Sequence, residues 1–296
     1  MKPTVVSLFS GGGGLDLGFK NSGFNIIWAI DIDKDAVSTY KENLGDHIIL
    51  GDITKIQEKD IPEADVVIGG PPCQSFSLVG KRRSDDERGQ LVWQYLRIIN
   101  EIRPKCFVFE NVVGLKSAKT AEGNLVLDEL IIAFREIGYE VQWSVLNAAD
   151  YGVPQRRKRI FIVGTREGIK FNFPLPTHNE KGNDGKVKWI SVEEALGDLP
   201  SPNTDGIVKY STEPLNPYQL KMRENNFDDY VTEHSTPKLS ELDKMIIEHI
   251  PVGGNYMDVP DFVPSQRIKK FKETGGRTTC YGRLRPDKPS YTIDQM

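Results

Sequence analysis

The chain has 296 residues, of which 38% are hydrophobic and 27% are charged, and its formal net charge is −4. These values are typical of a soluble globular protein with room for one large domain and a smaller one. The acidic balance argues against a uniformly basic nucleic-acid-binding protein, so any contact with a polyanion would have to come from local basic clusters.

Targeting and redox signals are sparse. The apolar run VVSLF near the N-terminus is too short for the core of a signal peptide, and no run reaches membrane-spanning length. The three cysteines, Cys73, Cys106 and Cys280, have no CxxC spacing, which argues against a disulfide framework or a structural zinc site. We therefore expect a cytoplasmic protein and no metal.

Short β-branched runs alternate with helical patterns from residue 3 to about residue 166. This alternation predicts an α/β fold with a mostly parallel sheet. In segment 89–102, apolar residues recur at the spacing of a helix with one buried face, at Leu91, Tyr95, Ile98, Ile99 and Ile102. The predicted strands are TVVSLF, FNIIWAID, HIIL, DVVIGG, KCFVFEN and RIFIVG.

The amino-acid composition and the patterning of apolar residues change after Arg166. FNFPLPTHNEKGNDGK is rich in Pro, Gly and Asn, and the residues that follow contain one clear helical pattern, LSELDKMIIEHI. This composition predicts a linker and then a second, smaller and irregular domain.

The first predicted strand runs into SGGGG and then into a helical pattern. A strand, a glycine turn and a helix N-terminus let backbone amides approach a bound ligand closely. The third glycine of the dinucleotide fingerprint is replaced by Asp16 or Leu17, depending on which glycines are counted. A NAD-dependent oxidoreductase is therefore disfavoured.

Two carboxylates follow successive predicted strands. Asp31 ends the second strand about 20 residues after the glycines, where a carboxylate can accept hydrogen bonds from ribose hydroxyls. Asp52, in GDIT, follows the third strand at the same edge of the sheet and could bind an adenine amino group. Each alone would more simply be a helix cap. Together they favour a ligand that contains a nucleoside and no pyrophosphate.

The segment GGPPCQSFS places Cys73 directly after two prolines. The prolines fix the backbone φ and remove two amide donors, so the thiol is held by a stiff loop, as suits a nucleophile. Cys106 lies in a predicted core strand and is interpreted as structural. None of the four histidines lies in a strand-end loop of the first domain, which disfavours a Cys/His hydrolase.

Two further strand ends supply polar groups. Glu110 lies just past a buried strand, on the same predicted edge as Cys73, where it could share a proton with a ring nitrogen. In QRRKRIFIVG, Arg157 and Arg159 alternate as they lead into a strand, and Gln155 has the same phase. Alternate residues of a strand point to one face, so these side chains predict a pocket wall.

The motifs described above, in their order along the chain, make it similar to the bacterial DNA (cytosine-5-)-methyltransferases. The resemblance covers residues 3 to about 165, and YGRLRPDKPSYTI is similar to the family segment that follows target recognition. The family implies a doubly wound, Rossmann-like fold and S-adenosyl-L-methionine as cofactor. The motifs that carry the resemblance are FSGGGGLDLGF, AIDID, GDIT, GGPPCQSFS, ENV and QRRKR.

The resemblance implies a mechanism on a cytosine flipped out of duplex DNA. The residue at Cys73 adds to carbon 6, the one at Glu110 engages ring nitrogen 3, and Arg157 and Arg159 hold the base. Carbon 5 then takes the methyl group, a base removes the carbon 5 proton, and the thiolate leaves. For the cofactor, Phe9 would stack on the adenine, Asp31 would bind the ribose and Asp52 the adenine amine. The full implied cofactor set is Phe9, Ser10, Gly11, Gly13, Gly14, Leu15, Asp31, Ile32, Asp52, Ile53, Pro72 and Leu91.

DNA contacts are expected from two basic segments. KRRSDDERG, residues 81–89, resembles the family's loop that closes over DNA. Residues 266–288 contain eight Lys or Arg residues and two acids, a local charge of +6, which favours a phosphate-binding surface. The expected DNA-binding residues are Gln74, Ser77, Lys81, Arg82, Arg83, Arg88, Gln155, Arg277, Arg283 and Arg285.

The expected domains are a cofactor-binding catalytic domain (1–170), a target-recognition domain (171–276) and the start of a returning segment (277–296). Family members continue past PSYTI into a last conserved block, whereas this chain stops at Met296. We therefore expect either a fragment or one part of a split enzyme, whose second polypeptide supplies that block. The alternatives to an active DNA methyltransferase are a DNA- or cofactor-binding subunit that is inactive alone and an RNA cytosine methyltransferase.

Overall fold

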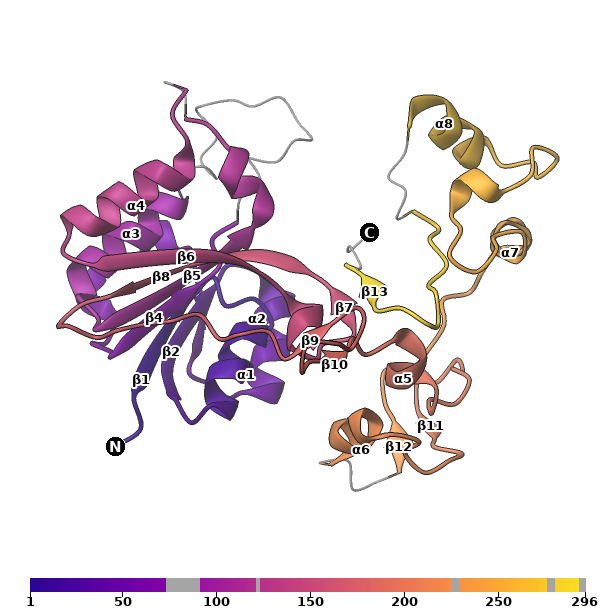
Figure 1. The fold of residues 1–296 in the computed structure, drawn as a ribbon, viewed down its shortest axis with the longest axis horizontal. Helices are drawn as coiled ribbons and strands as arrows, with labels where there is room; N and C mark the ends of the chain where they lie inside the picture. Colours follow the sequence, from indigo (N-terminus) through magenta and orange to yellow (C-terminus); the bar gives the residue numbers. More distant parts are fainter. Residues whose placement is uncertain (73–90, 121–122, 225–228, 276–279, 293–296) are drawn as a thin grey trace. The chain divides into compact units, whose positions relative to one another are not determined.

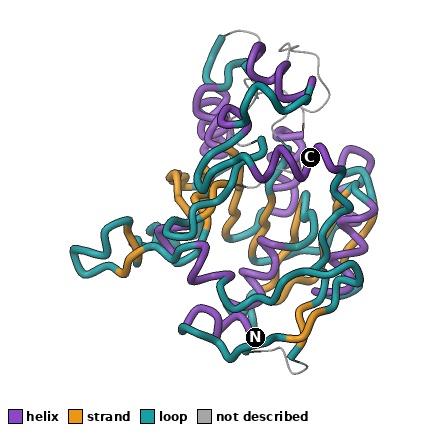
Figure 2. The backbone as a smooth tube through the Cα atoms, turned by 90° about the vertical axis from the view of Figure 1, so that its right-hand side faces the viewer, coloured by secondary structure: helices purple, strands orange, loops and turns teal. Residues whose placement is uncertain are grey.

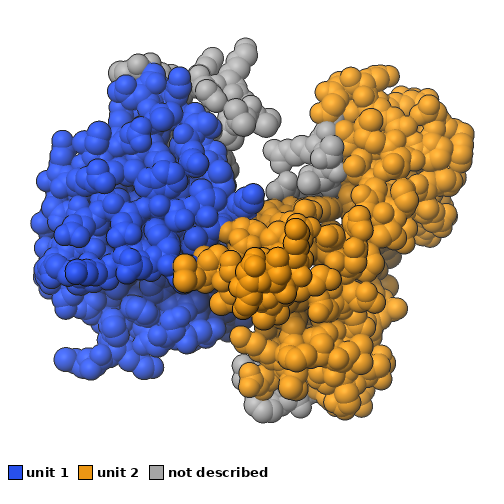
Figure 3. Space-filling model, in the orientation of Figure 1, with its two compact units in different colours: residues 1–146, 158–174 blue, residues 147–157, 175–296 orange. Residues whose placement is uncertain are grey.

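The computed structural model describes residues 1–72, 91–120, 123–224, 229–275 and 280–292. The chain forms two compact units, coloured separately in Figure 3. Unit 1 consists of residues 1–146 and 158–174, and unit 2 consists of residues 147–157 and 175–296. The functional division at residues 170 and 276 stays a prediction.

Unit 1 contains a seven-stranded sheet in the order β3-β2-β1-β4-β5-β8-β6 (Figure 1). The pairs β1–β2, β1–β4, β2–β3 and β4–β5 are parallel, and β5–β8 is antiparallel. The predicted mostly parallel sheet is confirmed, and every predicted strand is present. The strands are β1 (Thr4–Leu8), β2 (Asn25–Asp31), β3 (Ile48–Leu50), β4 (Val66–Gly69), β5 (Cys106–Val112), β6 (Glu140–Asn147) and β8 (Lys158–Thr165).

Alternating residues of β1 show that both faces of the sheet are covered. Val6 and Leu8 belong to the buried cluster that includes α3 and α4, whereas Val5 packs in another cluster with residues of α1. This arrangement is doubly wound, as expected. No helix in the described part of the chain is long and apolar enough to cross a membrane. The helices are α1 (Gly14–Asn21), α2 (Lys34–Asn43), α3 (Leu91–Ile102) and α4 (Val126–Glu136).

Unit 2 has short elements separated by long loops, drawn in teal in Figure 2. Its strands pair two by two, as β9–β10, β11–β12 and β7–β13. One small buried cluster joins Ile246, Ile250 and Tyr256 to Ile268. The elements are β7 (Gln155–Arg156), β9 (His178–Asn179), β10 (Val187–Lys188), α5 (Val192–Leu196), β11 (Val208–Lys209), α6 (Pro217–Arg223), β12 (Tyr230–Val231), α7 (Glu241–Glu248), α8 (Gln266–Thr274) and β13 (Ser290–Tyr291).

The expectation of a single clear helix after Arg166 was wrong. The predicted helix is present as α7, but α5, α6 and α8 accompany it. These helices are short, and side-chain caps begin them: Ser191 and Glu194 form a reciprocal capping box at α5, and Asn216 caps α6. Local caps and not a long apolar period therefore define these elements.

A buried ion pair supports the middle of unit 2. Nε of Arg223 in α6 donates to Oδ2 of Asp198 at 2.8 Å, and the two side chains are only 11% and 4% exposed. The Arg223 guanidinium also lies 3.4 Å from the centroid of the Tyr210 ring. These contacts join α6 to the residues that follow α5 and β11.

Candidate active site

The glycine turn between β1 and α1 is tied to the end of β2. The amide of Ser10 donates to the carbonyl of Ile30 at 3.1 Å, and the amide of Gly11 donates to Oδ2 of Asp31 at 2.7 Å. Phe9, Gly11 and Gly13 all have positive φ values, of 55°, 54° and 88°. The predicted order of strand, glycine turn and helix is present, and the turn ties the end of β1 to the end of β2.

A cavity of about 270 Å³ lies beside this turn, within unit 1. Among the residues predicted to bind the cofactor, those that line it are Phe9, Asp31, Ile32, Asp52, Ile53, Pro72 and Leu91. The cavity wall is completed by Ile30, Gly51 and Gly70. Of the other predicted residues, Ser10, Gly11, Gly13 and Gly14 form the turn and the start of α1, and Leu15 packs in the core.

Both carboxylates of this cavity also accept hydrogen bonds from the protein. The two oxygens of Asp31 accept from the amides of Gly11, at 2.7 Å, and Asp33, at 2.9 Å. Oδ1 of Asp52 accepts from the hydroxyl of Thr54 at 2.7 Å and from its amide at 3.0 Å, and these bonds lower the pKa of Asp52. Asp52 is thus a cap and a cavity wall at once.

Glu110 and Arg159 lie on neighbouring antiparallel strands, β5 and β8. Nε of Arg159 is 3.1 Å from Oε1 of Glu110, and the side chains are only 18% and 25% exposed. Glu110 belongs to β5 itself, which continues to Val112, and does not follow the strand as predicted. The partly buried carboxylate therefore has a cation fixed beside it by strand register.

The end of β4 approaches Glu110 closely. A Cβ atom placed on Gly70 would lie 3.0 Å from Oε2 of Glu110, so a larger residue would force that oxygen to shift. Nδ2 of the buried Asn111 donates to the carbonyl of Pro71 at 3.0 Å. Neither contact was predicted from the sequence, although Gly70 and Asn111 lie inside the GGPP and ENV motifs.

Gln155 and Arg157 belong to unit 2, whereas Arg159 belongs to unit 1. Gln155 lies in β7, opposite Ser290 of β13. Arg157 is exposed and lies between β7 and β8, outside both strands. The alternation of side chains along a strand therefore does not fix the direction of its side chain. Its carbonyl accepts from the amide of Ala148 at 2.9 Å.

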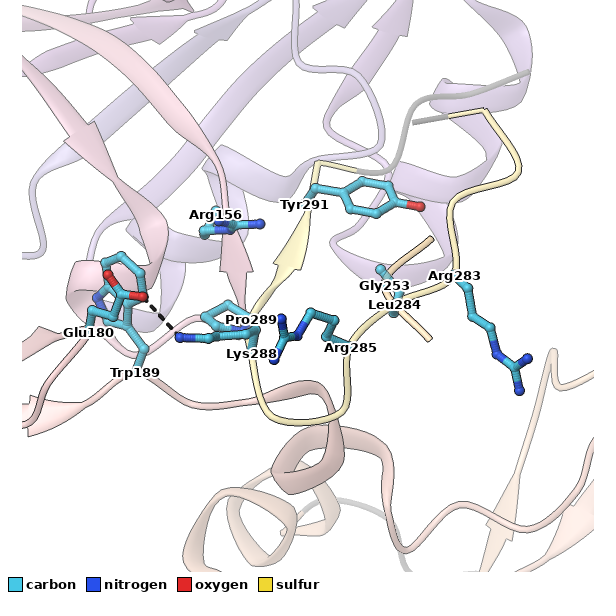
Figure 4. A pocket seen from close by; sticks show the side chains of 10 residues that line it. All are labelled: Arg156, Glu180, Trp189, Gly253, Arg283, Leu284, Arg285, Lys288, Pro289 and Tyr291. Atoms are coloured by element: carbon cyan, nitrogen blue, oxygen red, sulfur yellow. Dashed lines mark hydrogen bonds and ion pairs between the residues drawn. The ribbon is translucent and has the colours of Figure 1, made fainter. Parts of the chain in front are cut away.

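A cavity of about 300 Å³ in unit 2 gathers basic side chains (Figure 4). Predicted residues Arg283 and Arg285 line it, and so do Arg156 and Lys288, which the sequence analysis did not select. Lys288 is paired with Glu180 at 3.0 Å. Within the described ranges, the Arg156 side chain forms no hydrogen bond or ion pair, although the pKa of Glu180 is lowered mainly by Lys288 and also by the charge of Arg156.

The basic segment 266–288 is less positive in the fold than in the sequence. Arg285 pairs with Asp287 inside the segment, at 2.9 Å. Carboxylates outside the segment neutralise three further cations, in the pairs Arg267–Asp243, Lys272–Asp261 and Lys288–Glu180. The local charge of +6 therefore overstates the positive electrostatic potential that this segment would present to a polyanion.

Several predicted site residues lie outside the described residues. They include the proposed nucleophile and most of the expected DNA-binding loop. They are Cys73, Gln74, Ser77, Lys81, Arg82, Arg83, Arg88 and Arg277.

Comparison with known proteins identifies the family. The model of the C-5 cytosine-specific DNA methylases matches residues 3–283. The Type II methyltransferase M.FnuDI of Fusobacterium nucleatum is 46% identical over 97% of this chain and 74% of its own length. The Type II methyltransferase M.NgoFVII of Neisseria gonorrhoeae is 36% identical over 99% of this chain and 70% of its own length.

Solved structures support the fold. A protein described as a DNA modification methyltransferase encoded within an E. coli prophage superposes with a TM-score of 0.73 at 21% identity, over 99% of this chain and 82% of that one. The family match spans nearly the whole chain and includes the strand ends that line the cavity of unit 1. The chain therefore belongs to the C-5 cytosine-specific DNA methylase family and is a DNA cytosine methyltransferase.

Proposed function

We propose that the chain transfers a methyl group from S-adenosyl-L-methionine to carbon 5 of a cytosine flipped out of duplex DNA, through a covalent adduct with Cys73. The observation that carries this proposal is the Glu110–Arg159 pair beside Gly70, because it holds a partly buried carboxylate next to the chain segment that leads into Cys73. The relatives named above are Type II methyltransferases, which supports a role in restriction-modification.

The cavity of unit 1 fits the cofactor chemically. Apolar side chains of Phe9, Ile32 and Leu91 offer surfaces for an adenine ring, and Ile32 is 71% exposed. Asp31 retains acceptor capacity for ribose hydroxyls beyond the two amides it already accepts, and Asp52 can accept from an exocyclic amine. When bound, the cofactor supplies an electrophilic methyl group on its sulfonium.

The protein's own groups would activate the cytosine. The Cys73 thiolate forms a bond to carbon 6, Glu110 gives a proton to nitrogen 3, and the electron pair that arises at carbon 5 takes the methyl group. Loss of the carbon 5 proton to a base then breaks the bond from sulfur to carbon 6, while nitrogen 3 returns its proton to Glu110. Arg159 holds the Glu110 carboxylate in place through the cycle.

Fixed backbone groups are proposed to aim the nucleophile. Asn111 holds the carbonyl of Pro71, two residues before Cys73, and Gly70 lets that segment pass close to Glu110. A preorganised loop of this kind lowers the entropy that must be lost when nucleophile and base meet.

DNA is proposed to meet basic side chains of unit 2. Arg156, Arg283, Arg285 and Lys288 surround one cavity and would contact backbone phosphates, since arginine pairs readily with phosphate oxygens. Three of these residues already have protein partners, so Arg156 is expected to contribute most.

The test is nucleoside mass spectrometry of mixed-sequence duplex DNA after incubation with S-adenosyl-L-methionine. The unmodified chain should form 5-methylcytosine, and Cys73→Ala should form none while binding the cofactor with unchanged affinity. Product from Cys73→Ala above background would remove Cys73 from the nucleophile role. Folded RNA is the acceptor control, and methylation of RNA alone would overturn the choice of substrate.

A second experiment addresses the covalent step. A duplex that carries 5-fluorocytosine at target sites should trap the chain in a denaturant-resistant complex, because the fluorine at carbon 5 cannot leave as a proton does. Cys73→Ala is the matched control. An active preparation that forms no such complex would contradict addition at carbon 6.

A further inference from the structure

One buried carboxylate of unit 1 has no part in the proposed chemistry. Asp16, in the first turn of α1, is fully buried. Its Oδ2 accepts from the hydroxyl of Ser7 in β1 at 2.9 Å, and its Oδ1 accepts from the hydroxyl of Tyr40 in α2 at 2.9 Å. A buried carboxylate is costly unless hydrogen bonds satisfy it, so this arrangement calls for a reason.

The hydrogen bonds extend to a histidine. Nε2 of His47 lies 3.0 Å from the Tyr40 hydroxyl, and the two rings meet edge to face at 5.4 Å between centroids. An ionised Asp16 can only accept, so Tyr40 gives it its single hydroxyl proton. Nε2 of His47 must then carry the proton that it donates to the Tyr40 oxygen. The chain of donors therefore runs from His47 to Tyr40 to Asp16.

The Tyr40 ring also supports the glycine turn directly. A Cβ atom placed on Gly13 would collide first with Cδ1 of Leu44 and would lie 2.8 Å from Cδ2 of Tyr40, so the Tyr40 ring and Leu44 together pack against the bare backbone of the turn. A Cβ atom placed on Gly12 would lie 3.6 Å from Cγ2 of the neighbouring α2 residue Thr39, which is an ordinary van der Waals contact. Gly13 in turn precedes α1, and its carbonyl accepts from the amide of Leu17 at 2.8 Å.

We propose that Asp16, Tyr40 and His47 form a positioning network for the cofactor, in which the Tyr40 hydroxyl locks the first turn of α1 while its ring holds Gly13. Tyr40 thereby connects the buried hydrogen bonds to the glycine turn. In the same turn, the amide of Gly11 donates to Asp31, which lines the cavity. The inference rests on the proposed function, in that the cavity beside this turn binds S-adenosyl-L-methionine.

Tyr40→Phe tests the network by removing one hydroxyl and leaving the ring. Calorimetric titration with S-adenosyl-L-methionine should show binding weakened about tenfold, because a hydrogen bond to a buried charge is lost beside the site. The methylation rate at saturating cofactor and the affinity for DNA should stay within about twofold of the unmodified chain, since neither depends on the turn.

Tyr139→Phe is the matched control. Tyr139 is also buried, at 3% exposure, and its hydroxyl donates to the carbonyl of Pro104 at 2.7 Å, away from the glycine turn. It should lose similar thermal stability and keep its cofactor affinity. If Tyr139→Phe weakens cofactor binding as much as Tyr40→Phe does, general destabilisation explains the effect and the network has no positioning role.

A ligand-free measurement separates this inference from the proposed function. In Tyr40→Phe without cofactor, amide hydrogen exchange should accelerate at residues 11–14 and not in β5. An unmodified chain that binds no S-adenosyl-L-methionine would refute the proposed function. Binding by the unmodified chain and by Tyr40→Phe with equal affinity, and unchanged exchange at the turn, would refute the network alone.

The histidine provides a second pair of variants in case Tyr40→Phe does not fold. His47→Gln keeps an amide donor near the position of Nε2, and His47→Leu removes it. His47→Gln should retain cofactor affinity, whereas His47→Leu should weaken it several-fold. Equal affinity in the two variants would show that the donor at this position is irrelevant.

Discussion

The two units hold their functional side chains by different means. In unit 1, neighbouring strands fix Glu110 against Arg159, and helices on both faces bury the sheet. In unit 2, the basic cavity is assembled from two-residue strands, loops and ion pairs such as Lys288–Glu180. Sites built on strands are positioned more precisely than sites on loops, whereas exposed ion pairs contribute little stability. The chemistry therefore has a rigid support, and the basic surface can adapt to its ligand.

The largest expected effect is on chemistry in unit 1. Glu110→Gln keeps the shape of the side chain and removes the acid, so single-turnover methyl transfer should fall about 10²- to 10⁴-fold, while cofactor and DNA binding persist. Glu136→Gln, on the exposed face of α4, should leave the rate unchanged. A Glu110→Gln rate within a factor of a few of the unmodified chain would exclude proton transfer by this residue.

The next effect is on the stability of unit 2. Arg223→Ala leaves Asp198 buried without its cation and should cost about 3 to 5 kcal/mol. Hydrogen exchange should rise across unit 2 and stay unchanged in the sheet of unit 1. Lys244→Ala, which breaks the exposed pair with Glu241, should cost less than about 1 kcal/mol. An equal increase in hydrogen exchange in both units would contradict the expectation that Arg223 stabilises unit 2 alone.

Salt dependence probes the basic cavity. If Arg156 neutralises one phosphate, Arg156→Gln should reduce the slope of log affinity for duplex DNA against log salt by about 0.9. Glu180→Gln should act in the opposite direction and strengthen binding, because it removes the carboxylate from the same cavity. Arg135→Gln, on α4, is the control. An unchanged slope in Arg156→Gln would place the phosphate contacts elsewhere.

The smallest effect concerns pH. Burial lowers the pKa of His47, so the unfolded chain binds a proton more readily, and stability should fall as the pH drops from about 6.5 towards the folded-state pKa. Burial raises the pKa of Asp16, so its contribution has the opposite sign, and stability should fall as the pH rises from about 3.9 towards that raised pKa. His47→Gln should flatten the stability profile near pH 6 in urea unfolding. An unaltered profile would show that His47 is not its source.

The sequence predicted the fold of unit 1 where its pattern was strong. β1, β2 and β4 are mainly apolar runs that are largely buried, and β5 alternates buried and half-buried residues; such runs are visible without a structure. β6 was missed because EVQWSVLN mixes polar and apolar residues and only two of its eight residues are buried. α2 was missed because only Val37 and Tyr40 of its ten residues are buried.

The sequence predicted which residues belong to the candidate site, but not which of them contact one another. Motifs selected Glu110 and Arg159, but their pairing depends on the antiparallel register of β5 and β8, which the chain order does not reveal. Arg156 and Lys288 were missed because each lies in a run of charges whose exposed members look alike in sequence. Only the fold distinguishes a cation with a carboxylate partner from one without.

The pairing of β7 with β13 limits how unit 2 can be exchanged between relatives. Residues 147–157 belong to unit 2, and Gln155 and Arg156 pair with Ser290 and Tyr291. A graft that replaced residues 175–296 alone would join a foreign β13 to the native β7. Functional chimaeras should therefore transfer residues 147–157 and 175–296 together. Natural recombination that keeps this strand pairing should likewise yield active enzymes.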